Sequence, residues 1–195
     1  MSISQFETPD IIIEGHIKIV DVDTNEVLVK RRNAVNFENM SIALASLLAN
    51  VSGPTATYEI GSVRFGNGGT VLDGLGSITY KATNTNTAAS TLYNQTFSKD
   101  IDGSSDNNTA FAHTSGTFYS DVITTCTLDY GEPVGQDATD TSTDFDGDYV
   151  FDELGIFTVN GDMLTHVIFH PVQKSANRKI QVIYTLRIRT AFSDV

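Results

Sequence analysis

Several features that define common protein classes are scarce or absent in this chain of 195 residues. Its single cysteine, Cys126, excludes an internal disulfide framework. No run reaches the roughly 18 apolar residues of a membrane-spanning helix, and the first residues, MSISQFETPD, have neither the basic nor the apolar region of a secretory signal. We therefore expect synthesis and folding in the cytoplasm, with stability supplied by packing or by assembly with other subunits.

Basic residues are also scarce. Twelve Lys and Arg stand against 24 Asp and Glu, which gives a net charge of -12. Because like charges repel, we expect neither nucleic acid nor an anionic membrane surface as a partner. The hydrophobic fraction of 40% is ordinary for a folded protein, and the length suits one domain over residues 1–195.

Strand patterns cover most of the chain. Residues 11–22 and 27–35 are rich in β-branched residues and flank the turn DTNE, which predicts a hairpin. Apolar residues alternate along 180–188, so one face of that strand is predicted to be buried. Asn160-Gly161 lies between two hydrophobic runs and predicts a hairpin with a type I′ turn, since both residues tolerate positive φ. The sequence therefore predicts an all-β fold, an antiparallel β-sandwich or jelly roll.

One segment has the period of a helix. Asn36 is a suitable N-cap, and the apolar residues that follow lie at i, i+3, i+4, i+7 and i+8, which predicts a short amphipathic helix near residues 37–49 with one buried stripe: Met40, Ala43, Leu44, Leu47 and Leu48. Long polar loops are expected around 82–116 and 130–148, and such polar tracts form loops or edge strands at the rim of a domain.

The candidate catalytic residues do not combine into a site. His166 and His170 share a strand face but lie roughly 13 Å apart there, too far to bind one ion, and His16 and His113 have no partner nearby in the sequence. Asp152 and Glu153 are adjacent, so on a strand they are expected to face opposite ways. Cys126 lies in the β-branched run TTCTL, which is typical of a buried thiol rather than a nucleophile.

Two loops resemble ligand-binding motifs. The glycines of EIGSVRFGNGGT follow a strand, but no Lys-Ser/Thr pair and no helix pattern comes next, so a turn with positive φ is the better interpretation than a phosphate cradle. The second loop has the spacing of a calcium-binding loop, with one weak ligand at its first position: Ser142, Asp144, Asp146, Gly147, Asp148 and Glu153. We interpret it as a solvated acidic loop that folds without calcium. No catalytic, cofactor-binding or metal-binding residue is predicted, and the protein is not expected to be an enzyme.

The order of these segments carries a resemblance. A hairpin ending in VLVKRRNAV, the helix FENMSIALASLLAN, the strand EIGSVRFGNGG and the run FDELGIFTVNGDMLTHVIFHPVQKS before a terminal strand resemble small structural proteins of tailed bacteriophage virions. The resemblance implies a non-enzymatic subunit of the tail, neck or collar, baseplate or fibre attachment, located in the virion. Its implied partners are other virion proteins and copies of itself, with no cofactor and no small-molecule substrate.

Two alternatives stay open. One is a capsid decoration protein, and the other is a glycan-binding β-sandwich module used in host attachment. The absence of Trp weighs against the glycan-binding module, because such sites use exposed aromatic stacking platforms.

Charge is divided along the second half of the sequence. Residues 132–162 contain nine acidic residues and no Lys or Arg, whereas residues 163–193 contain no acid and five basic residues: Lys174, Arg178, Lys179, Arg187 and Arg189. This division predicts that a basic edge of one subunit meets the acidic loop of the next.

Overall fold

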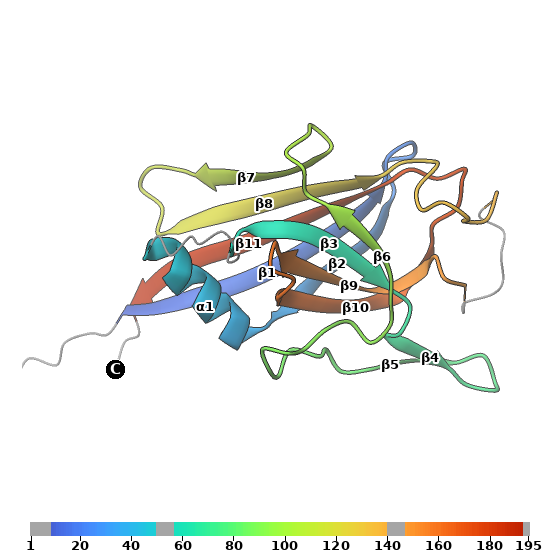
Figure 1. Cartoon of the computed structure of the whole chain (residues 1–195), viewed down its shortest axis with the longest axis horizontal. Helices are drawn as coiled ribbons and strands as arrows, with labels where there is room; N and C mark the ends of the chain where they lie inside the picture. The colour runs from blue at the N-terminus through green and yellow to red at the C-terminus, as the bar shows by residue number, and fades with distance from the viewer. Residues whose placement is uncertain (1–8, 50–56, 140–146, 193–195) are drawn as a thin grey trace, which may run out of the picture.

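The computed structural model describes residues 9–49, 57–139 and 147–192, and these form strands with one helix (Figure 1). The expected all-β class with a single short helix is confirmed. In chain order the elements are β1 (Pro9–Asp21), β2 (Val27–Val35), α1 (Phe37–Leu48), β3 (Ile60–Gly66), β4 (Thr70–Leu72), β5 (Ile78–Tyr80), β6 (Gln95–Asp100), β7 (Asn107–His113), β8 (Tyr119–Leu128), β9 (Val150–Thr158), β10 (Met163–Gln173) and β11 (Ile180–Phe192).

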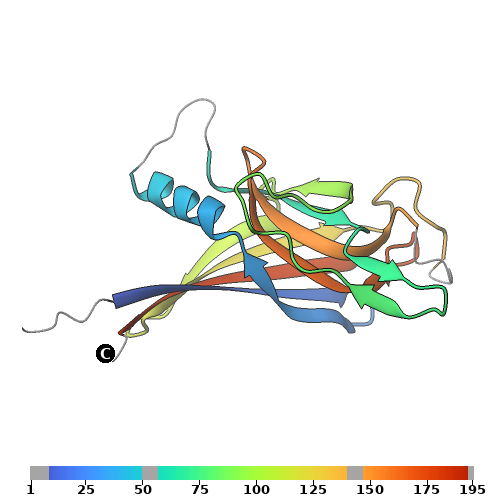
Figure 2. The same cartoon turned by 90° about the horizontal axis from the view of Figure 1, so that it is seen from below.

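Nine of these strands form one antiparallel sheet in the order β6-β3-β9-β10-β2-β1-β11-β8-β7. The link between β10 and β2 consists of only two residue pairs, Thr165 with Val35 and His166 with Ala34. At this narrow link the sheet turns over on itself, so that the group from β6 to β10 faces the group from β2 to β7 (Figures 1 and 2). The polar tract at 82–116 supplies both edge strands, β6 and β7, together with loops.

The core lies between the two halves of the sheet. On β11, Ile180, Val182 and Tyr184 are buried as their alternation predicts, and on β1 the buried residues are Ile17 and Ile19. Each of these strands therefore has one face in the core and one face directed outward.

The hairpin between β9 and β10 is present, but its predicted turn type is wrong. Gly161 has a φ of 93°, whereas Asn160 is not in the left-handed region. The amide of Gly161 donates to the carbonyl of Thr158, and the amide of Thr158 donates to the carbonyl of Asp162. The two strands are therefore connected by a three-residue loop, residues 159–161, in which only Gly161 has a positive φ.

Helix α1 begins as predicted, with the side chain of Asn36 accepting a hydrogen bond from the amide of Asn39 at 3.2 Å. Its apolar stripe is only partly buried. Met40 and Ala43 lie in the core, but Leu47 is exposed and Leu48 is 89% exposed. The first half of the helix therefore packs against the core, and the second half extends past it into solvent.

The predicted basic edge is not present. β11 lies inside the sheet between β1 and β8, not at its margin. Arg187 forms two hydrogen bonds of 2.7 Å to Asp121 on β8, and Arg189 lies 3.4 Å from Glu14 on β1. Lys174 is buried. The two arginines are neutralised within the subunit, because the strand pairing brings acids from distant parts of the sequence beside them, whereas Lys174 contacts the neutral oxygens of Gln136 and Ser175.

Candidate functional site

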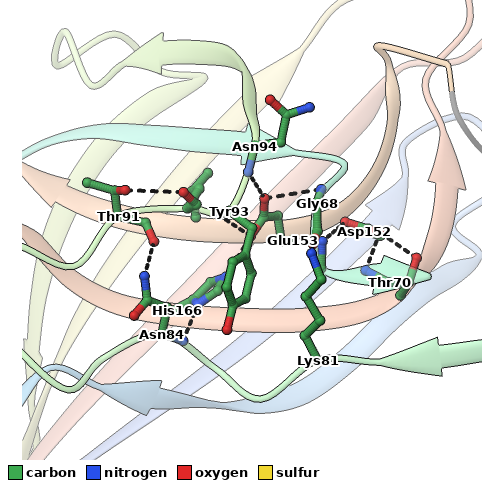
Figure 3. Close-up of polar contacts among 12 residues, drawn as sticks. Gly68, Thr70, Lys81, Asn84, Thr91, Tyr93, Asn94, Asp152, Glu153 and His166 are labelled. Atoms are coloured by element: carbon green, nitrogen blue, oxygen red, sulfur yellow. Dashed lines mark hydrogen bonds and ion pairs between the residues drawn. The ribbon is translucent and has the colours of Figure 1, made fainter.

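The most concentrated polar cluster of the described chain lies where β9 and β10 meet the loop that follows β3. Asp152 and Glu153 come from the middle of β9, and His166 comes from the adjacent strand β10 (Figure 3). All three side chains are buried. Buried carboxylates need hydrogen bonds or opposite charge to offset the loss of hydration, so the partners of these two define what the cluster does.

His166 is held as a neutral imidazole. Its Nδ1 accepts a hydrogen bond of 2.9 Å from the amide of Asn84, and a backbone N–H can only donate. The ring proton is therefore on Nε2, which lies 3.0 Å from Oε2 of Glu153 and donates to it. The pair is an ionised glutamate and a neutral histidine, with both ring nitrogens occupied.

Glu153 accepts four hydrogen bonds. Oε1 accepts from the amides of Asn94 at 2.8 Å and Gly68 at 3.2 Å, and Oε2 accepts from the amide of Tyr93 at 3.0 Å as well as from His166. Burial acts to raise the pKa of Glu153, but the hydrogen bonds from His166, Asn94 and Tyr93 outweigh it and hold the pKa below its ordinary value. Glu153 thus joins three separate segments of the chain.

Asp152 binds the next amides of the same loop. Its oxygens accept from the amide of Gly69 at 2.8 Å, from the amide of Thr70 at 2.7 Å and from the hydroxyl of Thr70. Burial raises the pKa of Asp152, and the neighbouring Glu153 charge adds to that rise. The prediction that Asp152 and Glu153 face opposite ways is therefore wrong. Both carboxylates reach the same loop, next to the point where the register between β9 and β10 shifts between Ile168 and Val172.

The backbone amides of the glycine-rich loop already donate to side chains of the protein. The amides of Gly68, Gly69 and Thr70 point at Asp152 and Glu153, so they are not free to hold a phosphate. Its glycines lack the predicted positive φ. They are needed for close approach instead, because a Cβ on Gly68 would lie 2.7 Å from the amide nitrogen of Asn94 and one on Gly66 would overlap the carbonyl of Asn94.

The remaining histidines lie apart from this cluster. His170 is exposed on β10, where its Nδ1 lies 3.3 Å from the hydroxyl of Tyr80. His113 on β7 contacts the carbonyl of Tyr119 at 3.0 Å through Nδ1, and His16 is exposed on β1. His166 and His170 thus share a strand but bind different partners.

Of the calcium-type loop, Ser142, Asp144 and Asp146 lie outside the described residues. Glu153, at its twelfth position, has both oxygens engaged in the cluster above. Within residues 9–49, 57–139 and 147–192, no group of three or more His, Cys, Asp or Glu side chains is placed to hold a metal ion.

Cys126 is buried in the core, and burial raises the pKa of its thiol to about 12. The described helix is too short to cross a membrane.

The hydrogen bonds of this cluster hold two loops against the sheet. It ties the loop at 67–70 and the segment at 84–94 to β9 and β10, and every polar atom of Glu153 and His166 is used in doing so. Sequence reasoning missed this role, although a signal was present. Two adjacent acids in the hydrophobic run DYVFDELGIFTV predict buried carboxylates, and buried carboxylates require partners.

The chain matches no protein-family model, no curated protein and no solved structure.

Proposed function

We propose that the chain is a non-enzymatic structural subunit of a tailed bacteriophage virion, repeated by symmetry in the tail, neck or collar, or baseplate. The observation that carries the proposal is an exposed apolar end of the sandwich, which requires a protein partner. The resemblance of the segment order to structural proteins of tailed bacteriophages is the reason for proposing a phage virion as the assembly.

The apolar end lies where β1 begins, β11 ends and α1 is attached (Figures 1 and 2). There, Ile11 is 67% exposed and Phe111 is 74% exposed. The strand registers put both on the face of the sheet that is buried elsewhere, because Ile11 alternates with Ile13 and Ile17, and Phe111 is directly opposite Val122. The core-forming face of the sheet therefore continues past the core.

A groove runs between the helix and this face. It encloses a cavity of about 200 Å³ whose lining is mainly apolar, including Leu44, Leu47, Ile60, Val122 and Ile188. Leu48 protrudes beside it at the end of α1. Large contiguous apolar surfaces are uncommon on monomers and mark sites of protein contact. Burying one such side chain stabilises a contact by about 1.5–3 kcal/mol, so a few of them per interface suffice to drive assembly.

The polar cluster fits a structural role better than a catalytic one. A general base needs an accessible lone pair within reach of a substrate proton. In the Glu153–His166 pair, both imidazole nitrogens and both carboxylate oxygens bind other atoms of the chain, and the two side chains are fully buried.

The test is the oligomeric state of the purified chain, measured by light scattering at micromolar concentration for the wild type, Leu48→Lys and Phe111→Lys. We expect the wild type to assemble and each variant to shift towards monomer, since a lysine at the apolar end must be desolvated on contact.

Leu75→Lys is the matched control. Leu75 is 94% exposed in the turn between β4 and β5, away from α1, so this variant is expected to assemble as the wild type does. A monomeric wild type, or assembly unchanged by Leu48→Lys and Phe111→Lys, would contradict the proposed apolar contact.

A further inference from the structure

A hollow on the outer side of the sheet gathers basic residues in an otherwise acidic protein. It has a volume of about 450 Å³ and lies over β1, β2 and β11, with these residues in its lining: His16, Lys18, Lys30, Arg31, Arg32 and Ile183. Of the 12 Lys and Arg residues in the chain, Lys18, Lys30 and Arg32 lie on this outer face, and Arg31, which is directly opposite Ile17, lines the hollow from the other face of β2.

Strand register arranges the side chains in two rows. Lys18 on β1 is directly opposite Lys30 on β2 and Ile183 on β11, and His16 is directly opposite Arg32 and Thr185. Directly opposite residues share a face, and so do alternate residues along one strand. The rows lie roughly 7 Å apart and their members about 5 Å apart. The face is the outer one, because the intervening Ile17 is buried in the core.

These basic groups are poorly neutralised within the subunit. Lys18 and Lys30 have no hydrogen bond or ion pair with any described residue, although like charges placed directly opposite each other are unfavourable. Arg31 contacts the ring of Tyr80, with 5.4 Å to its centroid, and Arg32 shares Glu14 with Arg189.

The Lys and Arg residues outside the hollow all have polar contacts within the subunit. Each of the other eight Lys and Arg residues contacts an oxygen atom of an acidic, amide, hydroxyl or carbonyl group within the subunit. Five of these eight lie beside a carboxylate, and Arg64, Lys81 and Lys174 contact neutral oxygens. Among the described residues, Lys18, Lys30 and Arg31 are the Lys and Arg that contact no oxygen atom of the subunit, and all three line the hollow, which indicates an anionic partner.

We propose that the hollow receives the acidic segment of a second copy of the chain, an inference that rests on the proposed function of a repeated subunit. The segment contains Asp144, Asp146 and Asp148 at alternate positions. Three carboxylates within five residues give this segment the negative charge that complements the two basic rows.

The partner is a protein segment rather than nucleic acid, because the hollow presents only four Lys and Arg residues, whereas a phosphate backbone is bound by a longer series of them. A contact between the hollow of one copy and the acidic segment of the next joins two different surfaces. Such a heterologous contact closes into a ring or continues as a filament, which is the form of assembly that a tail or collar subunit requires.

The direct test uses a fluorescent peptide with the sequence of residues 137–149, DATDTSTDFDGDY, and the full chain. We expect binding that weakens as salt rises to about 300 mM, and that is at least about tenfold weaker for the double variant Lys18→Glu, Lys30→Glu. Lys81→Glu with Lys179→Glu changes the net charge equally and is expected to bind as the wild type does. A peptide with Asn at 144, 146 and 148 should not bind.

A charge swap tests the same contact in assembly. Self-association by sedimentation should fall in the Lys18→Glu, Lys30→Glu chain and in an Asp144→Lys, Asp146→Lys, Asp148→Lys chain, and should return when the two are mixed. Absent peptide binding, equal binding by the reversed chain, or tighter binding of a single-stranded oligonucleotide than of the peptide would overturn the inference. None of these results would contradict the proposed function, because that function is tested separately, by whether purified particles contain the chain.

Discussion

Glu153 is the residue on which the polar contacts of the fold converge. Its partners come from residues 68, 93, 94 and 166, and only the last lies near it in the sequence. The sequence indicates that this carboxylate is buried, because it lies in an apolar run. It cannot indicate the partners, because three of the four donors are backbone amides, which every segment offers alike.

Replacing Glu153 with Gln is expected to lower the free energy of unfolding at neutral pH by about 3 kcal/mol, since the change removes a buried charge that holds four donors. Urea denaturation measures the loss. Glu132→Gln is the matched control, because Glu132 forms a partly exposed ion pair with Lys99 and exposed pairs contribute only about 0–1 kcal/mol. Equal losses in the two variants would show that the cluster does not stabilise the fold.

The same pair of proteins gives a pH test. The folded pKa of Glu153 is below its ordinary value, so its stabilising effect is present above the unfolded pKa of about 4.3 and is lost as pH falls towards the folded pKa. The stability difference between wild type and Glu153→Gln should therefore shrink below about pH 4. A difference that stays constant from neutral pH to about pH 3 would contradict the hydrogen-bonded, ionised state.

Lys174 gives a prediction of the opposite sign. It is buried, its Nζ donates to Gln136 at 2.8 Å and to the carbonyl of Ser175 at 3.0 Å, and burial lowers its pKa to about 8. The unfolded chain holds this proton up to about pH 10.4, so between about pH 8 and 10 the unfolded state binds more protons and stability rises with pH.

Relative to Lys174→Met, the wild type should gain about 2–3 kcal/mol over that range. Denaturation at several alkaline pH values measures it, with Lys179→Met as the control at a partly exposed pair with Asp129. A wild type and a Lys174→Met variant with parallel pH profiles would contradict the lowered pKa.

At the scale of elements, the local sequence pattern predicted which segments are strands and which is the helix. It did not predict where the helix leaves the core or which segments contact one another. The helix and the hairpin of β9 and β10 follow from spacing and turn residues. The exposure of Leu48 does not, because periodicity defines an apolar stripe without saying how far the covering sheet extends. Likewise, the glycines at 66–69 signal a turn, but their need for close contact arises from residues 93–94 and 153, which only the tertiary structure brings there.

Gly68→Ala tests this element. The added Cβ would lie 2.7 Å from the backbone nitrogen of Asn94, so the loop has to shift and its hydrogen bonds to Asp152 and Glu153 weaken. We expect a loss of about 2–4 kcal/mol in the free energy of unfolding. Gly74→Ala is the control, since a Cβ there meets nothing within 4 Å and φ is not positive. That variant should be neutral or slightly stabilised, and similar effects of the two changes would refute the close-approach account.

At the scale of the whole molecule, the sequence predicted the all-β class but not the order of the strands. The central pairings join β1 with β11 and β2 with β10, elements separated by more than a hundred residues, and strand patterns do not specify such distant partners. This order also explains why the predicted basic edge is wrong, because β11 lies in the interior of the sheet and its arginines bind Asp121 and Glu14. The unpaired basic charge lies on β1 and β2 instead.

The central claim is that this chain is a repeated part of a virion, and the composition of purified particles tests it most directly. Quantitative mass spectrometry of tailed particles assembled from the genome that encodes the chain should detect it in a fixed copy number set by the symmetry of a ring, and Leu48→Lys should reduce that number while Leu75→Lys leaves it unchanged. Particles that are complete and infectious without the chain, while the chain accumulates free in the lysate, would contradict the account.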